Sequence, residues 1–140
     1  MTLTWSIEDR IPTAAEHREL AEAVGWYDSF DWDTLPASLA GSTFGVVAVW
    51  ESRVIGMARV VGDGVKYFYI QDVAVDPQHQ GRGVGRALLE RTLVLIGELA
   101  PSPAFVGLFS TAAGAALYES IGFTRGDMAG LFQIVPPTSP

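Results

Sequence analysis

A glycine-rich segment between a strand-like run and a helix-like run is the strongest constraint that this 140-residue sequence places on its fold. The segment is Gln80–Arg86, and it follows the β-rich run Tyr67–Val75 and precedes the apolar-striped stretch Ala87–Leu99. Glycines at such a junction let the backbone approach a ligand closely, and the first unpaired N–H groups of a helix attract anions. The pattern therefore predicts a phosphate-binding loop.

Two common phosphate loops do not fit the spacing of these glycines. A Walker loop ends in Gly-Lys-Ser/Thr, whereas this chain has Gly-Arg-Ala at residues 85–87. A dinucleotide-binding fingerprint through the first two glycines needs a small residue where Arg86 stands. What remains is the pattern Gln80-x-x-Gly83-x-Gly85, for which a tight turn at a glycine-rich helix start, without a ligand, is the alternative interpretation.

The composition excludes several classes of site. The chain has no cysteine, which excludes disulfides, a thiol nucleophile and thiolate metal ligands, and no metal site is expected. Hydrophobic residues make up 49% of the sequence, enough for the core of one domain at this length. The first five residues do not resemble a signal peptide, and the apolar stretches are too short and interrupted to span a bilayer. We therefore expect one soluble, cytoplasmic domain without a membrane partner.

The net charge of −7 lies entirely in the first 51 residues, which hold nine acidic and two basic residues. The remaining residues hold seven of each. Because nonspecific nucleic-acid binding needs a basic surface, this distribution argues against DNA or RNA as a partner. A cationic small molecule or a basic peptide would be attracted instead.

The sequence also predicts the order of helices and strands. A capping box at Thr13–Glu16 predicts a helix to about Val24, ended by Gly25. A short helix near Thr34–Leu39 and a hairpin of two strands come next. The strand-like segments are Phe44–Trp50, Val54–Val61, Tyr67–Val75, Ala104–Phe109, Phe123–Thr124 and Leu131–Val135. A helix over Thr111–Ile121 and a fraying Pro-rich tail complete the prediction.

A second motif lies at Ala116–Phe123, where the chain reads Ala-Leu-Tyr-Glu-Ser-Ile-Gly-Phe. Together with the glycine loop and the preceding Asp72–Pro77, it resembles the GCN5-related N-acetyltransferases, the GNAT superfamily. The predicted order βααβββαβαβ is similar to that family over nearly the whole chain. The resemblance implies a single-domain α/β (α+β) GNAT fold with a mixed, mostly antiparallel sheet flanked by helices. This domain would cover residues 1–135, with a tail at 136–140, and its cofactor would be acetyl-CoA.

The resemblance implies a cofactor site on three parts of the chain. Backbone groups at Val73, Ala74 and Val75, on a bulged and splayed strand, would pair with the pantetheine arm as a strand edge pairs with a peptide. The pyrophosphate would lie against Gln80, Gly81, Arg82, Gly83, Val84 and Gly85, with Arg82 and Arg86 as charged donors. Thr111 stands where the family often has an asparagine that contacts pantetheine; helix capping is its alternative role. His79 and Arg91 are expected to be solvated.

Two residues are predicted to carry the chemistry. The resemblance implies that Tyr118 protonates the leaving thiolate, and a phenol with a pKa near 10 suits this role; a core tyrosine is the alternative. An ammonium must lose a proton before it attacks, and Asp72 is the candidate base because Gln71 cannot accept a proton. Strand alternation places Asp72 opposite Gln71, while a bulge shifts this parity by one. A structural role for Asp72, with solvent or an acid near Asp28 as the base, is the alternative.

The segment Trp26–Asp33 interleaves aromatic and acidic residues without a helical or strand period. In the family, the first two helices and their connection form the wall that contacts the acceptor. The predicted substrate-binding residues are Trp26, Tyr27, Asp28, Asp31, Tyr69 and Gln71. Carboxylates pair with an ammonium and aromatic faces attract cations; solvated acids beside core aromatics are the alternative.

The expected function is therefore transfer of an acetyl group from acetyl-CoA to a primary amine by direct attack in a ternary complex. The expected acceptor is a cationic small molecule. A protein or peptide N-acetyltransferase and a non-catalytic acyl-CoA-binding regulatory module on the same fold are the alternatives. Since many members of the family are dimers, the resemblance also implies a possible homodimer.

Overall fold

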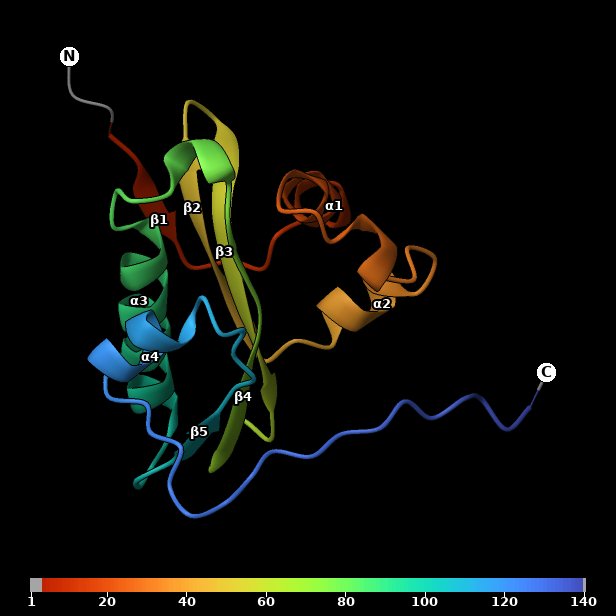
Figure 1. Ribbon diagram of the computed structural model, residues 1–140, viewed down its shortest axis with the longest axis vertical. Helices are drawn as coiled ribbons and strands as arrows, with labels where there is room; N and C mark the ends of the chain where they lie inside the picture. Colours follow the sequence, from red (N-terminus) through yellow and green to blue (C-terminus); the bar gives the residue numbers. More distant parts are fainter. Residues whose placement is uncertain (1–3, 140) are drawn as a thin grey trace. The chain divides into compact units, whose positions relative to one another are not determined.

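The computed structural model describes residues 4–139 and contains a five-stranded mixed sheet (Figure 1). The strands lie in the order β1-β2-β3-β4-β5; β1 to β4 pair antiparallel with one another, and β5 pairs parallel with β4. The strands are β1 (Ser6–Glu8), β2 (Phe44–Trp50), β3 (Arg53–Gly62), β4 (Tyr67–Val75) and β5 (Phe105–Gly107). The helices are α1 (Ala14–Ala23), α2 (Leu35–Ala40), α3 (Val84–Leu99) and α4 (Ala115–Ser120), with 3₁₀ turns η1 (Tyr27–Ser29) and η2 (Pro77–His79). This architecture confirms the predicted mixed α/β fold.

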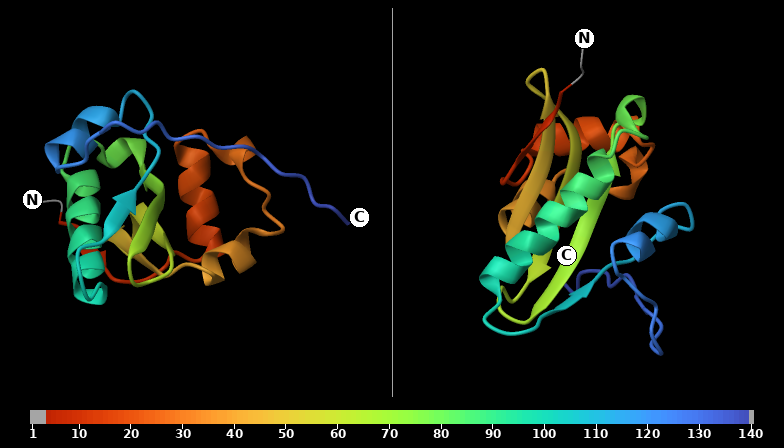
Figure 2. Two further views of the ribbon diagram at one scale, coloured as in Figure 1. Left: turned by 90° about the horizontal axis from the view of Figure 1, so that it is seen from below. Right: turned by 90° about the vertical axis from the view of Figure 1, so that its left-hand side faces the viewer.

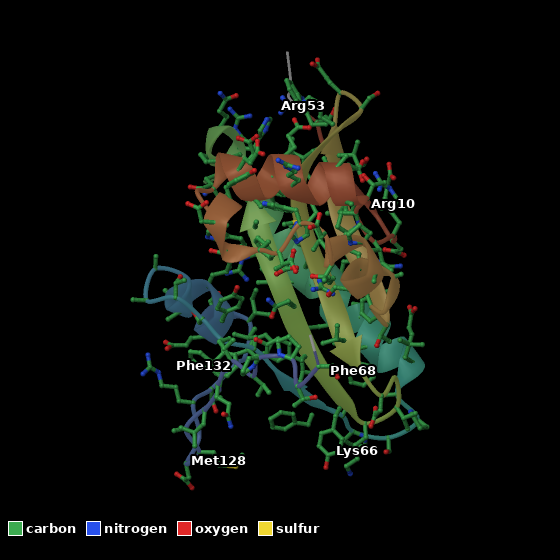
Figure 3. The ribbon with its side chains drawn as sticks, turned by 90° about the vertical axis from the view of Figure 1, so that its right-hand side faces the viewer. Arg10, Arg53, Lys66, Phe68, Met128 and Phe132 are labelled. Carbon is green, nitrogen blue, oxygen red and sulfur yellow. The ribbon has the colours of Figure 1, made fainter. Side chains whose placement is uncertain are left out.

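The chain divides into two compact units, one ending at Leu108 and the other beginning at Phe109. The first unit holds the whole sheet with α1, α2 and α3, and the second holds α4 and the C-terminal segment. Figure 3 looks onto the sheet from the side of α1 and α2, with Arg53 at the β2–β3 turn and Lys66 at the β3–β4 turn.

Helices cover both faces of the sheet in the first unit, with α3 on one face and α1 on the other (Figure 2). Side chains alternate along β2, so Val46 and Ala48 pack toward α3 whereas Val47 packs toward α1. On the α3 side they join Leu88, and on the α1 side Leu20, in two separate apolar clusters. The sheet is therefore buried on both faces, which holds the strand ends and the start of α3 in fixed positions.

Local sequence signals account for several element boundaries. The predicted capping box of α1 is present: the Thr13 side chain accepts from the Glu16 N–H, and the Glu16 side chain accepts from the Thr13 N–H. Arg10 also pairs with Glu16 through both terminal nitrogens, at 2.8 and 3.0 Å. The β2–β3 turn is made by Glu51 and Ser52, both with positive φ, as a two-residue hairpin turn requires.

Four predictions about the second half of the chain are wrong. Neither Phe123–Thr124 nor Leu131–Val135 forms a strand; Leu131, Phe132, Ile134 and Val135 are 72–89% exposed. A β-rich composition supplies no backbone partner, and a strand persists only where a neighbouring edge accepts its hydrogen bonds. The last helix is shorter than predicted because it begins only at Ala115. His79 is buried beside the Trp50 ring, at 4.9 Å between ring centroids, and is not solvated.

Candidate active site

A bulge interrupts β4 next to the predicted catalytic position. Met57 faces Ala74 and Arg59 faces Gln71, so one residue of β3 lies opposite two residues of β4, Asp72 and Val73. Asp72 has a φ of 58°, in the left-handed region that L-residues other than Asn and Asp seldom adopt. The expected bulge is therefore present, and it falls at Asp72.

The outer edge of β4 is paired over only part of its length. β5 pairs with residues 67–69 of β4, and within the described residues no strand pairs with Ile70–Val75 on that side. The Gln80 side chain donates to the Val75 carbonyl at 3.2 Å. The backbone edge that starts at Ile70 is thus the part of β4 that an extended polar ligand can pair with.

The glycine loop has the backbone geometry of an anion-binding helix start. Gly81 and Gly83 have φ values of 78° and 82°, and a Cβ at either position would meet no atom within 4 Å. Gly83 is the N-cap of α3 and no side chain caps this helix, so the N–H groups of residues 84–86 point forward without an intrahelical acceptor. The first intrahelical bond is donated by Ala87. This cradle fits a pyrophosphate.

Two arginines flank the loop, as the sequence predicts. Arg82 is exposed, and Arg86 lies on the first turn of α3 with its guanidinium 3.6 Å from the carboxylate of Glu90. An arginine beside a helix N-terminus adds charge-assisted donors for phosphate. The loop, the unpaired β4 edge and these side chains together fit a nucleotide-linked pantetheine.

The carboxylate of Asp72 is buried at the centre of a polar cluster. His17 Nε2 and Arg59 Nε lie 2.9 and 2.8 Å from its Oδ2, and Gln71 Nε2 donates to its Oδ1 at 2.9 Å. Gln71 and Asp72 thus touch each other, because the bulge breaks the alternation of faces. Burial raises the pKa of Asp72, but the hydrogen bonds from His17 and Arg59 and the charge of Arg59 outweigh burial and lower it. A carboxylate held in this way is a weak proton acceptor, which favours the structural alternative for Asp72.

His17 is a site residue to which the sequence analysis gave no role. Its side chain is fully buried on α1, and Arg59 anchors the same cluster through bonds of 3.2 Å to Ser38 and Ser42. The signal in the sequence is the position of His17 on the apolar stripe of α1 with Leu20 and Ala21, which are also buried. A histidine there must find a polar partner inside the protein.

The aromatic and acidic segment before α2 is partly core and partly surface. Trp26 packs against the cluster around Leu20, whereas the rings of Tyr27 and Trp32 lie 5.5 Å apart. The guanidinium of Arg18 lies over both rings, at 5.2 and 5.3 Å, and donates to the Tyr27 hydroxyl at 2.9 Å. A cation from the protein itself therefore already occupies these aromatic faces.

The acids of this segment differ in their surroundings. Asp28 is exposed on η1, while Asp31 accepts a hydrogen bond from the Asp33 N–H at 3.1 Å and so shapes the turn before α2. On β4, Tyr69 is half-buried, and the more exposed Tyr67 ring lies 6.2 Å from that of Phe105.

In the second unit, Tyr118 is half-buried on α4, with its ring 6.0 Å from that of Phe123. Burial raises the pKa of the Tyr118 phenol, so this group keeps its proton well above neutral pH. The Thr111 hydroxyl accepts from the Gly114 N–H at 3.2 Å, while Gly114 itself is the N-cap of α4. Thr111 therefore fixes the turn that leads into α4.

Other parts of the described chain offer less to a cofactor. A cavity of about 420 Å³ is lined by Phe44, Leu95 and Leu99 among others, near the C-terminal end of α3 and thus at the opposite end of that helix from the glycine loop. Residues 4–139 contain no group of three potential metal-ligating side chains. No helix in this range has the length and apolarity needed to cross a membrane.

Comparison with known proteins agrees with this geometry. A family model described as an acetyltransferase (GNAT) domain matches residues 41–125, more than half of the chain. GCN5-related N-acetyltransferase 2 of Arabidopsis thaliana is 36% identical over 73 residues, which are 52% of this chain and 28% of that protein. The chain thus spans less than a third of the length of this relative. Serotonin N-acetyltransferase 2 of Oryza sativa is 30% identical over 117 residues, 83% of this chain and 47% of that protein.

A solved structure is similar over its whole length. It is a protein of unknown function from meticillin-resistant Staphylococcus aureus, described as a probable acetyltransferase, with 27% identity and a TM-score of 0.84. The match covers 94% of this chain and 100% of that one. The chain therefore belongs to the GNAT acetyltransferase family. Membership confirms, at the level of the family, the predicted acetyltransferase class with acetyl-CoA as its cofactor.

Proposed function

We propose that this protein transfers the acetyl group of acetyl-CoA to a primary amine. The observation that carries the proposal is the bulged β4 edge leading into an uncapped α3 N-terminus with left-handed Gly81 and Gly83. Acetyl-CoA would supply an activated thioester for this reaction. The chain has no cysteine, so we propose direct attack by the amine in a ternary complex.

The proposed roles divide the site between binding and chemistry. The N–H groups of residues 80–86 bind the pyrophosphate, with Arg82 and Arg86 beside it, and the β4 edge at Val73–Val75 pairs with the pantetheine arm. A backbone N–H near Val73 stabilises the charge that develops on the acyl oxygen. Tyr118 holds a proton for the departing sulfur, which its raised pKa supports.

For the general base we propose a group other than Asp72, the candidate that the sequence predicts. Asp72 is buried and bound to Arg59 and His17, so we propose that it organises the site and that solvent, or an exposed acid such as Asp28, takes the proton of the ammonium. Gln71 donates a hydrogen bond to the other carboxylate oxygen of Asp72, and we propose that it helps to hold Asp72 in place.

For the acceptor we propose a cationic small molecule that meets the Trp26–Asp33 segment and Tyr69. The excess of acidic residues before residue 52 and the aromatic faces already bound to Arg18 support a cation. The rice relative is named for serotonin, a small amine, whereas a relative from Glycine max, 36% identical over 73 residues, is named a histone acetyltransferase. A basic peptide is therefore the second candidate acceptor.

Release of free thiol from acetyl-CoA, measured with a panel of amines and basic peptides, tests the proposal. We expect release with small cationic amines and little with peptides. Release with peptides alone would support the second candidate. Tight acetyl-CoA binding without release for any acceptor would instead favour a non-catalytic acyl-CoA-binding module.

We further propose that the chain is cytoplasmic and forms a homodimer. The C-terminal segment supports the dimer, because Met128, Leu131, Phe132, Ile134 and Val135 are each at least 72% exposed, and such apolar groups mark association surfaces. Light scattering during gel filtration measures the oligomeric state and tests the proposed homodimer. We expect a dimer for the wild type and a monomer for Leu131→Ser/Phe132→Ser; a monomeric wild type would refute the dimer.

A further inference from the structure

His17 contacts two parts of the candidate site that are far apart in sequence. Its Nε2 lies 2.9 Å from Oδ2 of Asp72 at the β4 bulge. Its ring meets Phe30 edge-on, at 4.8 Å between centroids and 89° between planes, and lies 6.2 Å from the Trp32 ring. His17 thereby connects the bulge to the segment that carries the proposed acceptor wall.

The bulge depends on side chains that hold Asp72. A left-handed conformation at a residue with a side chain is unfavourable by itself and persists where the surroundings hold it in place. Three donors do so here: His17 and Arg59 converge on Oδ2, and Gln71 donates to Oδ1. Arg59 is fixed in turn by Ser38 in α2, so the cluster joins α1, α2, β3 and β4.

The orientation of the His17 ring follows from its partners. Oδ2 of Asp72 accepts a hydrogen bond from Arg59 and lies 2.9 Å from Nε2 of His17, an arrangement in which Nε2 donates to the carboxylate. Nδ1 is buried and has no hydrogen-bond partner among the described residues. The polar contact at Nε2 and the edge contacts with Phe30 and Trp32 therefore determine the orientation of the His17 ring.

We propose that His17 is a positioning residue for acetyl transfer, which fixes the Phe30–Trp32 segment and the β4 bulge in one geometry. The inference rests on the proposed function, in which these two parts position the acceptor and the acyl donor. Displacement of reacting groups by about 1 Å can cost about 100-fold in rate. His17 influences the positions of the reacting groups through its contacts with Asp72 and with the Phe30 and Trp32 rings. It does not touch a reacting atom itself.

Hydrogen exchange of the whole protein tests this link without reference to activity. In His17→Leu we expect faster exchange in both residues 26–33 and residues 70–75. His17→Gln, which keeps a side-chain N–H for Asp72, should restore protection at residues 70–75. Ile96→Val, a buried change on α3 at the other face of the sheet, should leave both segments protected. Unchanged protection in His17→Leu, or loss confined to α1, would overturn the inference.

Kinetics provide the second measurement. We expect His17→Leu to lower kcat by roughly 10- to 100-fold and to raise the KM of the amine. Glycine adopts positive φ freely, so in an Asp72→Gly background the same change should lower kcat much less. An equal loss in both backgrounds would show that His17 acts only as core packing. A wild type that acetylates no amine would refute the proposed function, while hydrogen exchange would still decide whether His17 holds the two segments.

Discussion

Arg59 and Asp72 form a buried ion pair, 2.8 Å between Nε and Oδ2, although they do not face each other in the strand register. The residue opposite Arg59 is Gln71, and the bulge turns the next carboxylate back toward the guanidinium. A regular strand would place Asp72 on the other face of the sheet from Gln71. The pair therefore depends on the same irregularity that marks the candidate active site.

We expect Asp72→Asn to destabilise the protein by about 3 kcal/mol, because it leaves the buried guanidinium of Arg59 without its counter-charge. Asparagine tolerates the left-handed backbone, so the change tests charge and not backbone strain. Urea unfolding followed by circular dichroism measures the loss. Asp9→Asn, which breaks the exposed pair with Arg91, is the control and should cost much less. Equal small losses in both variants would show that the buried pair contributes little.

The same pair has a defined pH dependence. The pKa of Asp72 is lower in the folded protein than the value of about 3.9 in the unfolded chain, so its contribution is fully present above that value. The contribution is lost as the pH falls through the folded pKa. We expect the difference in free energy of unfolding between wild type and Asp72→Asn to be constant from pH 5 to 8 and to shrink below about pH 4. A difference that grew on acidification would contradict the direction of the pKa change.

The glycine loop permits a matched pair of substitutions on one helix. Gly83 has a φ of 82° with open space around it, so Gly83→Ala should destabilise the protein only through the left-handed backbone, by about 1 to 2 kcal/mol. The same substitution should weaken acetyl-CoA binding. Gly97 lies within α3 and also has no neighbour that a Cβ would meet, so Gly97→Ala should stabilise the protein by about 0.5 to 1 kcal/mol. Thermal unfolding and titration with acetyl-CoA measure both effects. Unchanged acetyl-CoA affinity in Gly83→Ala would argue against the loop as the phosphate site.

The sequence predicted the fold and the glycine-rich start of α3 because both rest on local signals. The capping box of α1, the strand Tyr67–Val75 and the glycine spacing are each readable within about ten residues. The contact between His17 and Asp72 was not readable from the sequence, since the two residues are 55 positions apart and only tertiary packing brings them together. The last strands were mispredicted for the related reason that a strand needs a partner edge, which propensity does not reveal.

We expect Tyr118→Phe to lower kcat by about 100-fold or more, the usual contribution of a general acid, with little change in acetyl-CoA affinity. Burial raises the pKa of this phenol, so activity that depends on its proton should persist through neutral pH and fall only above about pH 10. The measurement is kcat as a function of pH for both proteins. The variant should lack the alkaline decline. Equal rates at every pH would remove the acid role.

Substitution of Arg18 tests whether the aromatic segment Trp26–Asp33 recognises a cation. Its guanidinium lies over Tyr27 and Trp32, so a cationic acceptor that uses these faces must displace it. We expect Arg18→Ala to lower the KM of a cationic amine about two- to fivefold, since an exposed cation–π contact is worth roughly 0.5 to 1 kcal/mol. Asp28→Asn, which removes an exposed acid from the same segment, should raise that KM, whereas Asp63→Asn in the distant β3–β4 turn should not. Unchanged KM values in both Arg18→Ala and Asp28→Asn would place the acceptor elsewhere.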